Sequence, residues 1–209
     1  MNDIHIYDDL KILPERTCCF TGHRPASLGF AEESAECARI KARLREEILR
    51  HVALGVDTFI TGMAQGVDTW AGEICARLRR EGTPLRLIAA RPCPEQMKRA
   101  SGEAKRRYDA LLAECDAVVT VSPEYTPWCN HDRDRFMVDN SRYVIGVYNG
   151  ADSGGTYYTL RYARKLDRAV TLLTTGTILD LPLMGDEPDR RLWREKGGRG
   201  SAAVEKTQG

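Results

Sequence analysis

The sequence predicts an α/β protein: a single Rossmann-like domain with a doubly wound, mainly parallel sheet and helices on both faces. Short apolar runs alternate with amphipathic segments from about residue 17 to 173. The apolar runs lack the polar alternation of half-exposed strands, so both faces of the sheet are expected to be covered. Right-handed crossovers between successive strands then give the doubly wound arrangement.

The expected strands are the apolar runs, in chain order. They span residues 17–21, 58–61, 85–90, 117–121, 143–148 and 169–173. The first ends at Gly22 and Pro25, and the third is followed by Pro92 and Pro94, which interrupt regular structure. Cys18 and Cys19 alternate across the first strand and are expected to be buried.

The expected helices are the segments in which apolar residues recur every three or four positions. They span residues 34–54, 67–78, 97–115 and 154–166. Ser34 is a suitable N-cap for the first, and Trp70 lies on the apolar face of the second. No helix is expected between 122 and 142, where Cys129, His131 and Asp132 are interpreted as part of a loop rather than as metal ligands.

Length and composition set further bounds. We expect an N-terminal extension at 1–16, one domain at 17–185 and a disordered, glycine-rich tail at 186–209. Lys and Arg number 31 against 30 Asp and Glu, so the net charge of +1 does not favour nucleic acid or a membrane surface. The absence of a signal peptide and of an apolar run near 18 residues favours a cytoplasmic protein. The seven cysteines form no Cys-x-x-Cys pair, which fits reduced thiols.

One stretch is typical of a phosphate site. Residues 59–68 read Phe-Ile-Thr-Gly-Met-Ala-Gln-Gly-Val-Asp, which is an apolar strand, a glycine-containing turn and the start of a helix. A helix N-terminus presents free N–H groups and the positive end of the helix dipole. Because the carboxyl ends of parallel strands share one edge, a second glycine turn at 154–156 is expected nearby. The candidate ligand-binding residues are Thr21, Gly22, His23, Arg24, Thr61, Gly62, Met63, Ala64, Gly66, Asp68, Ser122, Arg135, Gly154, Gly155 and Thr156.

The pattern is neither the G-x-G-x-x-G dinucleotide motif nor the G-x-x-x-x-G-K-[ST] P-loop, which disfavours a dehydrogenase and a P-loop NTPase. Asp68 either accepts hydrogen bonds from ribose hydroxyls or holds the N–H groups of its own loop. Trp128, in a proline-containing loop, is freer than Trp70 to stack on a base. No cofactor or metal is expected.

Four segments together resemble the YpsA-like and YoqJ-like bacterial proteins of the SLOG superfamily. They are residues 19–25, 61–68, 133–141 and 154–163, and they cover the expected domain in order. The superfamily also contains the protein DprA and the LOG phosphoribohydrolases. The resemblance implies a Rossmann-like fold and binding of a nucleotide or nucleotide-derived ligand, in a sensor or effector role. It also favours a homodimer.

Two alternatives remain from the same resemblance. LOG enzymes carry P-G-G-x-G-T-x-x-E, and here Thr159 stands where the catalytic glutamate would be, so no catalytic residue is assigned. Asp68, Glu73 or Glu124 would have to replace it. A DprA-like protein would bind single-stranded DNA through a basic groove with stacking aromatics. The best segment for that role is 98–108, whose charges also suit an ordinary solvated helix face.

Overall fold

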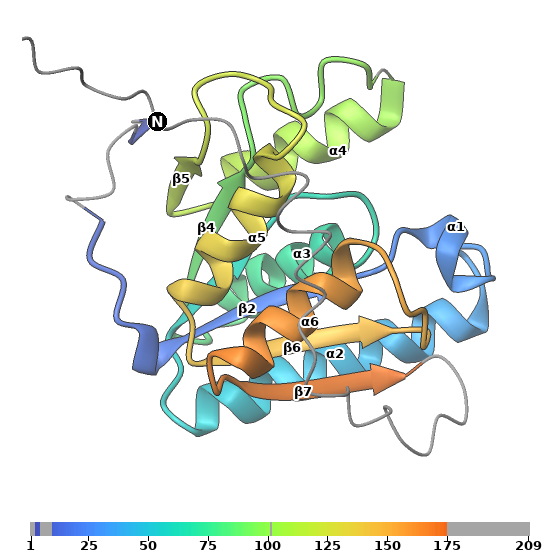
Figure 1. Cartoon of the computed structure of the whole chain (residues 1–209). Coiled ribbons are helices and arrows are strands. Elements are labelled where there is room, and N and C mark those ends of the chain that lie inside the picture. The colour runs from blue at the N-terminus through green and yellow to red at the C-terminus, as the bar shows by residue number, and fades with distance from the viewer. Residues whose placement is uncertain (1–2, 5–9, 101, 175–209) are drawn as a thin grey trace, which may run out of the picture. The chain divides into compact units, whose positions relative to one another are not determined.

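The apolar runs of the sequence form one parallel sheet in the computed structural model of the protein (Figure 1). The structure describes residues 3–4, 10–100 and 102–174. The tail expected at 186–209 and the end of the domain expected at 175–185 lie outside them. The strands are β1 (Asp3–Ile4), β2 (Thr17–Gly22), β3 (Thr58–Thr61), β4 (Arg86–Arg91), β5 (Ala117–Thr120), β6 (Tyr143–Tyr148) and β7 (Ala169–Thr174).

The order of the strands in the sheet is β1-β5-β4-β3-β2-β6-β7, and every pairing is parallel. From β2 the chain builds outward through β3, β4 and β5, and then returns to place β6 on the other side of β2. This reversal is a topological switch point, and it lies between β2 and β6. Gly22 at the end of β2 pairs with Val147 in β6, so both strands finish at the same level. The predicted fold class is confirmed.

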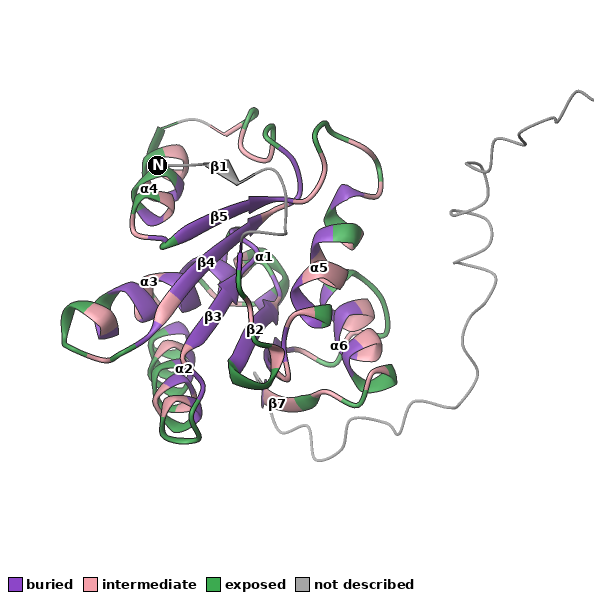
Figure 2. Cartoon of the chain, turned by 90° about the vertical axis from the view of Figure 1, so that its left-hand side faces the viewer, coloured by how far each residue is buried: buried purple, intermediate pink, exposed green. Residues whose placement is uncertain are grey.

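The helices are α1 (Pro25–Leu28), α2 (Ala35–Ala53), α3 (Val67–Arg80), α4 (Gly102–Ala113), α5 (Cys129–Asp139) and α6 (Gly155–Lys165), with a 3-10 turn at Pro14–Arg16. Figures 1 and 2 show α2, α3 and α4 on one face of the sheet and α5 and α6 on the other. Strands β2 to β6 are almost wholly buried, whereas the edge strand β7 is partly exposed (Figure 2).

Local sequence explains helices α2 and α3. Ser34 caps α2, where its Oγ accepts from the N–H of Cys37 at 3.1 Å. The buried side of α2 presents Ile40, Leu44 and Ile48 at helical spacing. Trp70 in α3 is 1% exposed, so its assignment to the core is confirmed. Cys18 and Cys19 are fully buried, as predicted.

The expected elements differ from the observed ones in three places. Helix α5 was not predicted, and the interpretation of Cys129 to Asp132 as a loop is wrong, because these residues form its first turn. Helix α4 begins at Gly102 rather than 97, after a series of turns that follows Pro94. Within the N-terminal segment expected to lie outside the domain, β1 pairs with β5 and extends the sheet.

Candidate functional site

The switch point brings the turn after β2 against the loop after β6. The side-chain amide of Asn149 donates to the carbonyl oxygen of Ser27 at 2.8 Å, which ties the loop after β6 to α1. The ring of His23 stacks on Tyr148, with centroids 5.7 Å apart and planes 18° apart. In open α/β sheets, ligands bind in the crevice at the carboxyl ends of the strands on either side of such a point.

His23 carries an unused polar group at this position. It is 9% exposed, and its Nε2 has no hydrogen-bond partner among the described residues. Burial lowers the pKa of His23 below 6.5, so the imidazole is neutral near pH 7. A buried polar atom without a partner is unfavourable, so a ligand atom that bonds to Nε2 would be stabilised there.

The start of α6 is open. Gly154, its N-cap, has φ +94°, and a β-carbon built on it would meet no atom within 4 Å. No side chain caps the helix, and both Gly154 and Gly155 are exposed while Thr156 is buried. The first N–H groups of a helix have no acceptor inside it, so this end can receive an anion.

The glycine turn before α3 is closed by the protein itself. Gly66 also has φ +94°, but a β-carbon there would lie 2.8 Å from the carbonyl oxygen of His23 and 2.9 Å from Cδ of Pro25. A β-carbon on Gly22 would lie 2.5 Å from the side chain of Val67. These glycines therefore permit the close approach of the turn after β2 to the start of α3.

Asp68 holds its own loop together. Its Oδ2 accepts from the N–H of Ala64 at 3.3 Å and lies 3.9 Å from Nη1 of Arg133. Asp68 is 7% exposed, and burial raises its pKa to about 6; Arg133 opposes this shift and Asp134 adds to it. Of the two roles open for Asp68, these contacts match the one within the loop.

Asp68 forms a group of charged side chains with Arg133 and Asp134 of α5. We call these three residues the acidic cluster. Nη1 of Arg133 donates to the carbonyl oxygen of Gly62, and its Nε donates to Oδ1 of Asp134 at 2.7 Å. Gly62 also accepts from the side-chain amide of Gln96 at 2.9 Å. Asp134 is missing from the candidate set derived from the sequence.

The other residues expected in the turn after β3 are structural. The hydroxyl of Thr61 donates to the carbonyl oxygen of Asp68 at 2.8 Å and accepts from the N–H of Met63 at 3.3 Å. Met63 is 1% exposed and adopts φ +59°.

Of the candidate residues at the end of β2, Thr21 is buried in the strand, and Arg24 is exposed beside the switch point.

Two candidate residues lie elsewhere. Ser122 follows β5, which lies four strands away from β6 in the sheet. At the usual distance between neighbouring strands, this is a separation of about 19 Å. Its N–H donates to the carbonyl oxygen of Pro92 at 2.9 Å. Arg135 packs between α5 and α6, with its guanidinium 5.7 Å from the ring centre of Tyr162.

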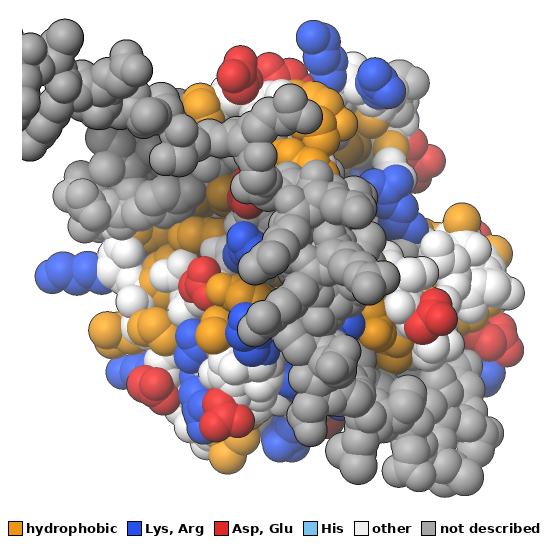
Figure 3. Space-filling view, viewed as in Figure 1, with side chains coloured by type: hydrophobic (Ala, Val, Ile, Leu, Met, Phe, Trp, Pro, Cys, Tyr) orange, Lys and Arg blue, Asp and Glu red, His pale blue; other side chains and the backbone are white. Residues whose placement is uncertain are grey.

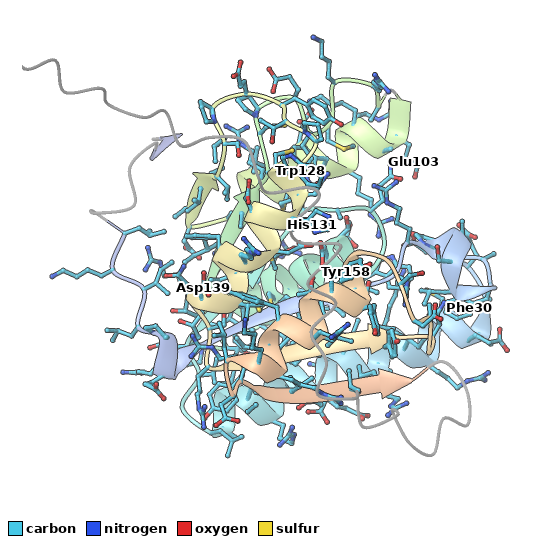
Figure 4. The ribbon with its side chains drawn as sticks, viewed as in Figure 1. Phe30, Glu103, Trp128, His131, Asp139 and Tyr158 are labelled. Atoms are coloured by element: carbon cyan, nitrogen blue, oxygen red, sulfur yellow. The ribbon has the colours of Figure 1, made fainter. Side chains whose placement is uncertain are left out.

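An aromatic row lies where α5 and α6 meet. Figure 4 shows Trp128, His131 and Tyr158 following one another from the start of α5 to α6. The ring centres of Trp128 and His131 are 6.3 Å apart, and those of His131 and Tyr158 are 6.1 Å apart. All three side chains are partly exposed, and Tyr158 is one turn into α6 from Gly154.

Two cations of the basic segment considered for DNA binding are paired with carboxylates in the structure. Arg107 bonds to Glu73 at 2.5 Å and to Glu32 at 2.8 Å, and Lys105 pairs with Asp109. Tyr108 is buried and cannot stack on a base from this position. On the face that Figure 3 shows, basic and acidic side chains are interspersed.

A cavity of about 230 Å³ lies between α2 and α3, away from the strand ends. Lys41 and Trp70 line it, and the ammonium group of Lys41 lies 5.1 Å from the centre of the indole ring. Among the described residues, no three His, Cys, Asp or Glu side chains are grouped so that they could hold a metal ion. No described helix is both long enough and apolar enough to span a membrane.

The family model described as YspA SLOG family matches residues 18–175. The chain belongs to this family. A UPF0398 protein of Lysinibacillus sphaericus is 27% identical over 178 residues, which cover 83% of this chain and 99% of that protein.

Two relatives from Bacillus subtilis carry the names that the sequence motifs suggested. UPF0398 protein YpsA is 26% identical over 153 residues, covering 72% of this chain and 85% of YpsA. The SPbeta prophage-derived protein YoqJ is 31% identical over 119 residues, covering 51% of this chain and 69% of YoqJ. The resemblance to the YpsA-like and YoqJ-like proteins is thus confirmed.

Proposed function

We propose that the protein binds a nucleotide or nucleotide-derived ligand at the carboxyl ends of β2 and β6. The observation that carries the proposal is the open N-terminus of α6 at this switch point, with the buried, unpartnered Nε2 of His23 just after β2. The exposed guanidinium of Arg24 supplies positive charge at the end of β2. Together these groups suit a phosphate.

Binding without chemistry, as in a sensor or effector, fits the residues better than hydrolysis. Thr159 stands at the position of the LOG glutamate, is 4% exposed, and donates its hydroxyl to the carbonyl oxygen of Gly155 at 2.8 Å. Glu73, one possible substitute, is bound to Arg107. Incubation with nucleoside monophosphates and ADP-ribose, followed by chromatography of the products, tests this choice: release of a free base would replace the sensor role with a phosphoribohydrolase role.

The binding site itself is tested by one substitution and its matched control. Gly155 can carry a side chain, since the nearest atom to its built β-carbon is Oδ2 of Asp134 at 3.9 Å. Gly155→Asp adds a carboxylate at the open start of α6, where it would repel a nearby phosphate, and Gly155→Ala adds bulk without charge. An acidic residue in the first helical turn is favourable for the helix itself, so the fold should persist.

The assay is a thermal-shift screen against nucleoside mono- and diphosphates, NAD, ADP-ribose and cyclic dinucleotides. A ligand at about 100 times its Kd stabilises by roughly 2.7 kcal/mol, which raises Tm by a few degrees. We expect a shift that Gly155→Ala retains and Gly155→Asp abolishes. A screen without any shift would overturn the proposal. Single-stranded DNA, with affinity that falls steeply with salt, would then be the next probe.

A further inference from the structure

The carboxylate of Asp134 has one oxygen in use and one available. Oδ1 accepts from Nε of Arg133 at 2.7 Å. Oδ2 accepts no hydrogen bond within the described part of the chain, and the side chain is 22% exposed. A β-carbon built on Gly155 would lie 3.9 Å from this oxygen. Oδ2 is therefore a hydrogen-bond acceptor beside the open start of α6.

Asp68 cannot take the same role. It is 7% exposed, and its Oδ2 is held by the N–H of Ala64 and by Arg133. A β-carbon built on Gly62 would lie 2.8 Å from Oδ2 of Asp68, so there is no space for a ligand beside this oxygen. Of the two carboxylates in the acidic cluster, only Asp134 is accessible.

The charge of the acidic cluster determines which ligand group can face it. Two carboxylates surround the single guanidinium of Arg133, so the ionised cluster carries one net negative charge. A phosphate placed against Oδ2 would be repelled, whereas a hydroxyl group would donate a hydrogen bond to it. Positive charge is available instead at the end of β2, from Arg24. The candidate site thus has a cation, Arg24, on the β2 side and a hydrogen-bond acceptor, Oδ2 of Asp134, on the α5 side.

We propose that Oδ2 of Asp134 accepts hydrogen bonds from the ribose hydroxyls of the ligand, so that the site selects ribonucleotides over 2′-deoxyribonucleotides. This inference rests on the proposed function and assigns the sugar subsite within it. A carboxylate oxygen can accept from a hydroxyl at the cost of little rearrangement, because Arg133 already fixes the other oxygen. The phosphate then lies toward Arg24 at the end of β2, away from Oδ2 of Asp134.

The test compares two pairs of probes by isothermal titration calorimetry on the full chain. The pairs are AMP with 2′-deoxy-AMP, and ribose 5-phosphate with 2-deoxyribose 5-phosphate. A hydrogen bond to a charged group corresponds to about tenfold to 100-fold in affinity, so the ribose form of each pair should bind more tightly by that factor. Asp134→Asn keeps an acceptor oxygen for Arg133 and replaces Oδ2 with an amide donor. It should bring the ratio close to one while the affinity for the deoxy form is retained.

Asp132→Asn is the matched control, because Asp132 is exposed on the same helix and changes charge equally. It should leave the ratio unchanged. Equal affinity of the wild type for both members of a pair, or a ratio unaffected by Asp134→Asn, would overturn this inference and leave the proposed function standing. If none of the four probes binds while another nucleotide does in the thermal screen, the comparison moves to that nucleotide and its deoxy form. If nothing binds in either assay, both proposals fail together.

Discussion

Asp68 makes the folding stability of this protein depend on pH in an unusual direction. Burial raises its pKa from 3.8 to about 6, although Arg133 lies 3.9 Å away. The folded state therefore binds more protons than the unfolded state between these two values. Because the slope of stability with pH follows the difference in bound protons, the contribution of Asp68 is fully present below about pH 4 and is lost as the pH rises through about 6.

The magnitude follows from the same two values. At 1.36 kcal/mol for each pH unit, the difference between 3.8 and about 6 amounts to about 3 kcal/mol. About 2 kcal/mol of this loss falls between about pH 4.5 and 7.5. Asp68→Asn removes the titration and keeps an oxygen that can accept from the N–H of Ala64.

Urea unfolding of the wild type and of Asp68→Asn at several pH values measures the effect. The wild type should lose about 2 kcal/mol relative to the variant across that range. Asp132→Asn, on the exposed side of α5, should show no such trend. A constant difference, or one in which the wild type gains with pH, would refute the argument, since it would mean that the attraction of Arg133 outweighs the burial of the carboxylate.

Three further outcomes follow from local geometry. Gly66→Ala and Gly154→Ala share φ +94°, and only the first places a β-carbon 2.8 Å from a carbonyl oxygen. Backbone strain should therefore cost each variant roughly 1–3 kcal/mol, and Gly66→Ala should lose about 1–3 kcal/mol more in urea unfolding; equal losses would contradict the close approach. Burial opposes ionisation of Glu32, but Arg107 and Lys41 hold its pKa at about 2. Arg107→Gln should raise that pKa toward 4.5 in carboxyl NMR titrations, and an unchanged value would be inconsistent with the ion pair. All seven cysteines are buried, so a thiol reagent should label the protein only as it unfolds, and rapid labelling of the native state would argue against this packing.

Strands β2 to β7 could be predicted from sequence because they are short apolar runs with clear boundaries. Helix α5 could not, because its inward positions are Cys129, Arg133 and Met137, four residues apart. An arginine at the middle position breaks the apolar pattern on which helix prediction depends. The four-residue spacing of these three positions was the available signal. Recognising it would have required the assumption that an arginine can be buried.

Packing between distant parts of the chain explains what the site prediction lacked. Motifs identify loops that follow strands, and two of the residues they selected, His23 and Gly154, lie just after β2 and after β6. Whether a loop is open depends on what packs against it from distant parts of the chain. Gly66 and Gly154 are alike in sequence context and in φ, but only tertiary contacts reveal that the first is covered by the turn after β2 and that the second is exposed. Asp134 was absent from the candidate set because it lies in α5, the helix that the sequence pattern did not predict.

The carbonyl oxygen of Gly62 accepts from both Arg133 and Gln96, which belong to different elements. The turn after β3 is thereby fixed in the folded protein before any ligand arrives, and the conformational entropy of ordering it is lost on folding rather than on binding. A ligand that binds beside this turn should therefore contact a protein surface that does not rearrange. Its affinity would then depend mainly on the rotational and torsional freedom that the ligand itself gives up.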